Sequence, residues 1–461
     1  MKKIHRRKFV QLAACSALSL RLSGPVFAEQ NFSSTTNSNI SPKLLAIGDS
    51  ILAAANDAIS SADSEYVSHN TLGEIVWAWM RNPFFSYEVW ATRNRTTNSF
   101  MQIDGSNQAV IGTTSRRLVD PDEVNHIREL NPDIVVVGFG ANDIPLGISL
   151  EEIKYNYTTF LDKMIGEDGR VVIVALVRPH VTSGAYEEIY NYAPDGNKWR
   201  AHFDLNKWLR DQLPKLYGDR LSVWDTFTPL ADPNSYLGSE FLPGMHRDGV
   251  HLTAQAAYAN SKTFEDAIAP FLTPTSPYLD ATAIDLIPTT STPLQHGHGV
   301  TGEGPVGWYI ARTIGEHSSA ALTTDSLGVT TIDFSIKDEE TVAFKIRFHP
   351  EKFISTENFL GKTVQLILPI VVEKFDGFEW IMASIYSGDK KYASESPRPY
   401  KKSSRDWPND RFSGHIITPG LKIDEIKDLG VTLEIRMRKG TGVPRIKILE
   451  GVILREVGDL D

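Results

Sequence analysis

The chain has 461 residues, of which 41% are hydrophobic and 23% are charged, a composition typical of globular proteins. This length predicts two domains. The chain carries 47 Lys and Arg against 57 Asp and Glu, a net charge of −10 without a long basic run, so nucleic acid is not an expected partner.

Cysteine content and hydropathy exclude two further classes. Cys15 is the single cysteine and lies near the N-terminus, which excludes intramolecular disulfides and cysteine-based metal sites. We expect neither a metal nor a cofactor. Outside the N-terminal region no run of 18 apolar residues occurs, so we expect no integral membrane segment in the mature chain.

The first 28 residues have the pattern of an export signal. A basic start is followed by a mildly apolar stretch, Phe9–Phe27, and by Ala28, which suits signal peptidase cleavage. The segment Arg6–Val10 also resembles a twin-arginine motif. We therefore expect residues 1–28 to direct the chain to the periplasm or outside a bacterial cell.

Two other interpretations of this segment stay open. It can be an ordinary basic helix, or Leu12–Cys15 can be a lipoprotein box, although the apolar stretch before Cys15 is very short. Residues 29–41 are rich in Ser, Thr and Asn and predict a flexible spacer.

From Lys43 onward, short apolar runs alternate with helical stretches. The runs cover 44–47, 134–137 and 171–176, and apolar runs of this kind are typical of parallel strands that are buried on both faces. Helical patterns lie between them. The sequence predicts a three-layer α/β domain over residues 42–272.

An aromatic segment lies between the first two apolar runs. Trp77 and Met80 are three residues apart on a predicted helix, which favours a place in the core. Phe84–Trp90 also favours the core, with a pocket wall or a sugar platform as the alternative.

The pattern changes after Phe271. Residues 273–294 are rich in Pro, Thr and Ser and predict a linker. Beyond them, alternating apolar residues predict an all-β sandwich or jelly roll over residues 295–461. The predicted strands are Val329–Ile336, Thr341–Phe348, Thr363–Val372, Phe378–Tyr386, Val431–Met437 and Arg445–Leu454.

Two polar motifs follow predicted strands, where ligands of parallel sheets bind. Gly48-Asp49-Ser50 places a serine at the start of a helix, whose backbone N–H can receive an oxyanion. Gly140–Asp143 follows the second run and contains Asn142. Taken singly, these are also compatible with a serine helix cap and an Asn-Asp turn.

The third motif is Asp248-Gly249-Val250-His251. An aspartate three residues before a histidine can orient the imidazole, which then acts as a base. Alone, it is compatible with a solvated loop. His180 and His246 are alternative bases, but neither has a carboxylate three residues earlier.

The fixed order of these three motifs resembles that of the SGNH hydrolases, also called the GDSL family, over residues 43–272. The resemblance implies a flavodoxin-like α/β fold. It implies that Ser50 is the nucleophile, that Asp248 and His251 complete the triad, and that Ser50, Gly112 and Asn142 form the oxyanion hole. Gly112 is the loosest of these matches.

The resemblance implies a serine esterase. Together with the export signal and the predicted β-sandwich, it favours a secreted enzyme that cleaves O-acyl esters, above all O-acetyl esters on a polysaccharide. The partner is then an ester substrate such as an acylated glycan. A polysaccharide O-acetyltransferase, a lipase or lysophospholipase, and an adhesive glycan-binding protein remain alternatives, although the complete triad argues against the last.

The C-terminal region offers a second, shorter resemblance. Residues 299–308, which end at Trp308, resemble the Gly-Trp opening of jelly-roll modules in carbohydrate-active hydrolases. Candidate sugar-stacking aromatics follow, with a plain sandwich core as the alternative. They are Phe375, Phe378, Trp380, Tyr386 and Tyr392. If this region only binds substrate, a chain ending at Phe271 should keep its activity on small esters and lose it on polymeric substrate. If the region packs broadly on the α/β domain, the truncated chain should instead expose an apolar interface and aggregate.

Overall fold

The computed structural model describes residues 42–53, 65–68, 73–81, 92–93, 107–180, 197–235, 238–272, 284–285, 291–293, 295–296, 298–305, 307–337, 341–348, 356–388, 391–395, 407–408, 410–418, 420–425 and 429–457. The predicted export signal, the spacer and the aromatic stretch 84–90 lie outside the described residues. No helix within the described ranges is long and apolar enough to span a membrane.

The N-terminal part contains a parallel sheet in the order β1-β4-β5-β6. The strands are β1 (Leu44–Gly48), β4 (Ile134–Gly138), β5 (Val171–Ala175) and β6 (Leu221–Trp224). On the outer side of β1, Asn107 forms a parallel bridge with Ala46, and Gln108 N–H donates to Ala46 O over 2.7 Å. The first strand therefore lies inside the sheet, as in flavodoxin-like folds, which confirms the predicted α/β class.

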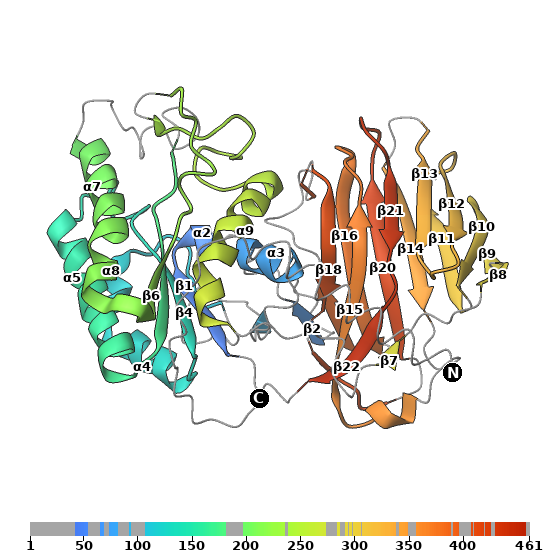
Figure 1. The fold of residues 1–461 in the computed structure, drawn as a ribbon, viewed down its shortest axis with the longest axis horizontal. Helices are drawn as coiled ribbons and strands as arrows, with labels where there is room; N and C mark the ends of the chain where they lie inside the picture. The colour runs from blue at the N-terminus through green and yellow to red at the C-terminus, as the bar shows by residue number, and fades with distance from the viewer. Residues whose placement is uncertain are drawn as a thin grey trace, which may run out of the picture. The chain divides into compact units, whose positions relative to one another are not determined.

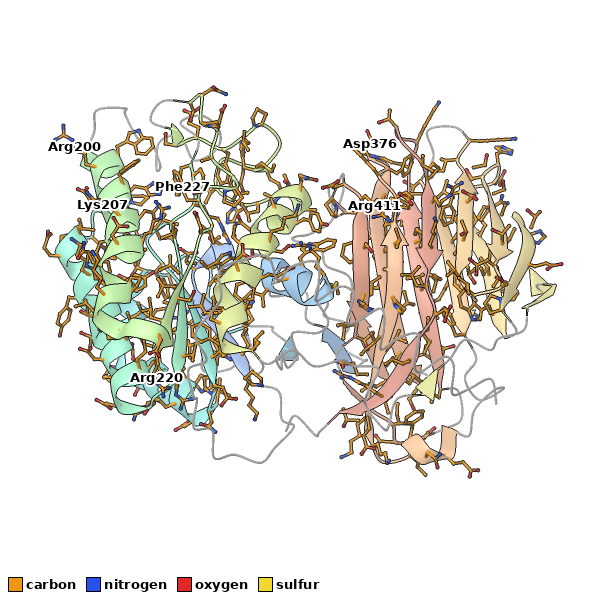
Figure 2. The ribbon with its side chains drawn as sticks, viewed as in Figure 1. Arg200, Lys207, Arg220, Phe227, Asp376 and Arg411 are labelled. Atoms are coloured by element: carbon orange, nitrogen blue, oxygen red, sulfur yellow. The ribbon has the colours of Figure 1, made fainter. Side chains whose placement is uncertain are left out.

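One face of this sheet packs on helices that are close to it in sequence; we call it the α5 face. Alternate strand residues such as Leu45, Val135 and Val172 share a hydrophobic cluster with these helices. The helices are α4 (Pro121–Glu129), α5 (Leu150–Leu161) with its π-helical extension η4 (Asp162–Glu167), α7 (Asn197–Asp211) and α8 (Leu213–Tyr217). Figure 1 shows them along the sheet, and Figure 2 shows Arg200 and Lys207 on the solvent side of α7.

The other face packs on α3 (Gly73–Arg81) and α9 (Ala254–Ile268); we call it the α3 face. The intervening strand residues, such as Leu44 and Val136, share a second cluster with Trp77 and Phe264. Because successive residues of a strand point to opposite faces, burial on both sides explains why the strands read as continuous apolar runs.

The C-terminal part consists of two large sheets whose residues share one hydrophobic cluster, which confirms the predicted all-β region. One sheet has the order β7-β22-β15-β21-β13-β12-β10-β8, with β18 and β19 also paired to β15. The other has the order β3-β2-β17-β16-β20-β14-β11-β9, in which β2 (Glu65–Ser68) and β3 (Thr92–Arg93) come from the N-terminal part of the chain. The strands of this part are β7 (Ile284–Asp285), β8 (Ser291–Pro293), β9 (Gln295–His296), β10 (Val300–Pro305), β11 (Trp308–Ile314), β12 (Ser319–Thr324), β13 (Thr330–Ser335), β14 (Val342–Phe348), β15 (Thr363–Val372), β16 (Phe378–Ser387), β17 (Lys391–Glu395), β18 (Phe412–Ile417), β19 (Leu421–Lys422), β20 (Gly430–Met437), β21 (Arg445–Ile448) and β22 (Ile453–Val457).

Two predictions for this region need correction. The expected strand Arg445–Leu454 is two strands, β21 and β22, which pair with different parts of β15. Among the candidate sugar-stacking residues, Phe375 and Phe378 are buried, with ring centroids 5.2 Å apart, so they belong to the core. Trp308 is also buried, against Phe348.

The C-terminal sheets include strands from the N-terminal part of the chain. β2 (Glu65–Ser68) pairs in parallel with β17, and β3 (Thr92–Arg93) pairs with β2. The segment between Ser50 and Gly112 therefore belongs partly to the β region. The boundaries expected at 272/273 and 294/295 remain predictions, and β7 and β8 lie inside the expected linker.

Helix α3 also packs on the β region. The ring of Trp77 lies 5.1 Å from Trp407 and 5.4 Å from Phe412 of β18, measured between centroids. The backbones approach so closely that a Cβ at Gly414 would lie 2.5 Å from Met80 O. Trp77 and Met80 are fully buried, which confirms their predicted core position.

Candidate active site

Ser50 lies at the carboxyl edge of the parallel sheet, where β1 ends at Gly48 and the short helix α2 (Ser50–Ala53) begins. The side chain of Asp49 caps this helix, because its Oδ1 accepts the N–H of Ile51 over 2.9 Å. The carbonyl of Gly48 accepts the N–H of Val110 over 3.0 Å. The nucleophile candidate is thus held by its own helix cap and by the adjacent chain.

The structure brings His251 and Asp248 to Ser50. His251 Nε2 lies 3.2 Å from Ser50 Oγ, and His251 Nδ1 lies 2.7 Å from Asp248 Oδ2. Asp248 Oδ1 also accepts the backbone N–H groups of Val250 and His251. This serine–histidine–carboxylate chain has the geometry in which an imidazole removes a proton from a serine hydroxyl.

Hydrogen bonds stabilise the ionised form of Asp248. Burial raises the pKa of its carboxyl, but hydrogen bonds from the ring and the N–H of His251 and from the N–H of Val250 outweigh burial, so the pKa lies below its usual range. A carboxylate that remains ionised fixes the Nδ1–H tautomer of His251 and leaves Nε2 to accept a proton.

Asn142 and Gly112 lie on two chain segments that are joined to each other beside Ser50. Asn142 Nδ2 donates to Thr113 O over 2.9 Å. Gly112 is exposed and has a φ of +75°, a backbone conformation that glycine adopts without strain. Since Val110 is bonded to Gly48, this turn lies next to the nucleophile loop.

A buried carboxylate that sequence reasoning did not assign holds this corner together. Asp143 accepts the N–H of Ser115 over 2.9 Å, its hydroxyl over 2.5 Å and the N–H of Gly140 over 3.1 Å. Asn156 of α5 donates to the same Ser115 hydroxyl. The position of Asp143 directly after Asn142 in the second motif was the one feature of the sequence that could have indicated this role.

A buried ion pair supports the other side of the nucleophile loop. Arg117 pairs with Glu123 of α4 and also donates to Gly48 O over 3.3 Å and to Gln108 O over 3.2 Å. Burial raises the pKa of Glu123 to about 7, and Arg117 opposes that shift. No sequence motif pointed to this arginine.

The alternative histidines take structural places. His246 Nδ1 accepts the N–H of Gly249 and so stabilises the turn that contains Asp248. His180 is buried, with its ring 5.3 Å from that of His202, and burial lowers the pKa of both. In the described part of the chain, no group of three or more His, Cys, Asp or Glu side chains could hold a metal ion.

Two comparisons with known sequences gave different results. A family model described as the GDSL-like lipase/acylhydrolase family matches residues 46–258. A search of curated proteins found no match to the chain.

Solved structures are similar to about half of the chain. A GDSL-like lipase from Bacteroides thetaiotaomicron is 15% identical over 50% of this chain and 89% of its own, with a TM-score of 0.32. A carbohydrate esterase of family 3 from Talaromyces cellulolyticus is 15% identical over 50% of this chain and 97% of its own, with a TM-score of 0.34. An acetyl-xylooligosaccharide esterase from Geobacillus Stearmophilus is 18% identical over 50% and 94%, with a TM-score of 0.33.

Proposed function

Since residues 46–258 belong to the GDSL-like lipase/acylhydrolase family and make this chain a carboxylic ester hydrolase, we propose that Ser50, His251 and Asp248 are its catalytic triad. The observation that carries the proposal is the continuous chain of contacts from Ser50 Oγ through the His251 ring to Asp248. Ser50 also stands at the carboxyl edge of the sheet, where parallel folds bind ligands.

The reaction follows from these contacts. Ser50 Oγ attacks the ester carbonyl carbon while His251 Nε2 accepts the hydroxyl proton, and Asp248 stabilises the imidazolium. The N–H groups of Ser50 and Gly112 and the amide of Asn142 receive the oxyanion. Collapse of the intermediate breaks the ester C–O bond, and the alcohol leaves with the proton from His251.

The second half of the reaction regenerates the serine. His251 takes a proton from water, the resulting hydroxide equivalent attacks the acyl carbonyl, and the acyl–Ser50 bond breaks with return of the proton to Ser50 Oγ. The products are a carboxylic acid and the free enzyme, so the cycle needs no cofactor.

We assign the substrate class as O-acyl esters, most often O-acetyl esters, on a polysaccharide outside the cytoplasm. Two sequence features support this finer proposal. The export signal predicted at residues 1–28 would direct the enzyme to where cell-surface and extracellular glycans occur. The strand-rich region after residue 294 is of the kind that carbohydrate-active hydrolases carry in addition to their catalytic domain.

A release assay tests the proposal. The purified enzyme is given acetylated oligosaccharides, short-chain p-nitrophenyl esters and long-chain p-nitrophenyl esters, and acetate or nitrophenol is measured. We expect acetate release without any added acceptor, little hydrolysis of long chains, and loss of turnover by roughly 10⁴–10⁶ in Ser50→Ala. We expect Asn142→Ala to lower kcat by roughly 10²–10³, as the loss of an oxyanion donor does.

The remaining outcomes separate the alternatives. Preference for long chains would indicate a lipase, and acetate transfer that requires a sugar acceptor would indicate an acetyltransferase. Near-normal hydrolysis by Ser50→Ala would contradict the triad itself.

A further inference from the structure

Behind Ser50 lies a buried arginine that the hydrolytic reaction does not use. Arg178 follows β5 at the carboxyl edge of the sheet, and only 2% of its surface is exposed. Its Nη2 forms a hydrogen-bonded ion pair with Glu74 Oε1 of α3, which is also buried. Removing both charges from water costs free energy, so a buried ion pair adds little to net stability. A role in the active site explains the pair better.

The same arginine faces the residue before the nucleophile. Arg178 and Asp49 line one cavity of about 20 Å³, together with Ile51 on the other side of Ser50. Arg178 Nε and Nη1 are buried and donate to no atom among the described residues. Glu74 therefore occupies only one edge of the guanidinium. The positive charge of Arg178 also acts on Asp49.

The position of Glu74 depends on the β region. Glu74 and Trp77 are three residues apart on α3, and Trp77 packs on Trp407 and Phe412 from the C-terminal sheets. Helix α9 contributes as well, because Asn260 Nδ2 donates to Glu74 Oε1 over 3.4 Å. A displacement of the β region would thus move α3, and with it the counterion of Arg178.

We propose that Arg178 and Glu74 are positioning residues of the active site: Arg178 stabilises the Asp49 side chain behind Ser50, and Glu74 holds Arg178 and connects the nucleophile loop to the β region through α3. This inference rests on the proposed function, because its readout is ester hydrolysis at Ser50. Neither residue takes part in bond making or breaking.

The electrostatics of Asp49 give the proposal its physical content. Burial raises the pKa of Asp49 to about 7, while the Ile51 N–H and then the positive charge of Arg178 oppose that rise. The other charged or titratable groups that act on Asp49 are Asp143 after β4 and His251 before α9.

Two further groups complete this environment. Tyr157 of α5 interacts with Asp49, and Glu74 acts indirectly, because it offsets part of the Arg178 charge. An ionised Asp49 accepts the Ile51 N–H more strongly and holds the first turn of α2, on which Ser50 lies. It also places a negative charge near His251, which favours the imidazolium formed during the reaction.

The test compares Glu74→Gln, Arg178→Gln and the double variant in the full-length enzyme. Thermal stability, kcat, KM and the pH profile of kcat/KM are measured on a small soluble ester. The two single variants should be less stable, because each leaves one buried charge without its partner. The double variant removes both charges and should regain most of the lost stability.

In the double variant, kcat should not recover together with thermal stability. We expect Arg178→Gln and the double variant to lose roughly tenfold to hundredfold in kcat, with KM within about twofold, because the nucleophile loop is displaced. The acid limb of the profile should move to higher pH in Arg178→Gln, where Asp49 loses its cation. It should move to lower pH in Glu74→Gln, where the cation is no longer offset.

A matched control is the partly exposed pair of Arg128 and Asp168, which joins α4 to the segment after η4. Arg128→Gln should leave kcat and the pH profile unchanged. Recovery of both stability and kcat in the double variant would overturn the proposal, as would pH shifts in the same direction in both single variants. If the single variants do not fold, the double variant still decides. Retained hydrolysis in Ser50→Ala would instead refute the proposed function.

Discussion

The two faces of the parallel sheet support the nucleophile loop in different ways. On the α5 face, Arg117 pairs with Glu123, six residues away, and donates to Gly48 O. On the α3 face, Arg178 pairs with Glu74, 104 residues away, and faces Asp49 across a cavity. A buried arginine–glutamate pair therefore lies on each side of the loop, but only the first is built from local sequence.

This difference shows which parts of the enzyme stand alone. The α5 face is completed by helices that follow its strands directly in the chain. The α3 face shares its hydrophobic cluster with residues as distant as Leu454 of β22, so the N-terminal part of the chain does not complete its own core. The β region is therefore part of the support of the active site as well as a candidate for substrate binding.

Removal of the β region gives the largest expected effect. A chain that ends at Phe271 should lose soluble, folded protein, because it exposes Trp77 and the rest of the shared cluster to water. Of the two outcomes that the sequence left open, activity on small esters or aggregation, the shared cluster favours aggregation. Gel filtration and circular dichroism measure the outcome. A monodisperse, folded truncated chain with normal activity on a small ester would show that the α3 face is independent after all.

A pair of single substitutions, one on each face, sharpens the comparison. Trp77→Ala on the α3 face and Phe160→Ala on the α5 face each remove a fully buried aromatic side chain, and each should cost about 3–5 kcal/mol in the free energy of unfolding. Only Trp77→Ala should also lower kcat, since it loosens α3 and Glu74. Urea unfolding and steady-state kinetics on both variants test this. An equal loss of kcat in both would mean that the faces do not differ.

Acid should weaken both regions to a smaller extent. Burial lowers the pKa of His202 on α7 and of His415 on β18 to about 4. The unfolded chain binds a proton at each histidine below about pH 6.5, whereas the folded chain does not until about pH 4. Stability is therefore fully present above pH 6.5 and falls between pH 6.5 and 4, by about 3 kcal/mol for each residue.

Urea unfolding as a function of pH separates the two contributions. His202→Gln should reduce the loss of stability with falling pH that comes from the α/β part, and His415→Gln should reduce the loss that comes from the β region. His317→Gln, at an exposed histidine, serves as a control. A decline that is unchanged in both variants would show that neither buried histidine is responsible.

The sequence predicted the elements of the fold that are set by local patterns. The apolar runs that became β1, β4 and β5 were recognised because burial on both faces leaves a continuous hydrophobic signature. The pairing of β2 with β17 was not predicted, since it joins short segments more than 300 residues apart and no local pattern records such a partner.

The same limit applies to the site. Ser50, Asn142 and His251 lie in short motifs whose order along the chain resembles that of the GDSL family, so their meeting at one site could be anticipated. Gly112 was matched more loosely, and its turn is tied to Asn142 through Thr113. The pair of Arg178 and Glu74 gave no signal, because an arginine after a strand and a glutamate in a helix are individually ordinary, and only the tertiary fold buries them together.

The central claim is that Ser50 is acylated during ester hydrolysis. The most direct test is to quench the reaction of a p-nitrophenyl ester at low pH, or to label the enzyme with a fluorophosphonate, and to map the modified peptide by mass spectrometry. We predict a single adduct on Ser50 that is absent from Ser50→Ala and strongly reduced in His251→Ala. An adduct on a different residue, or full hydrolysis by an enzyme in which Ser50 stays unmodified, would contradict the account.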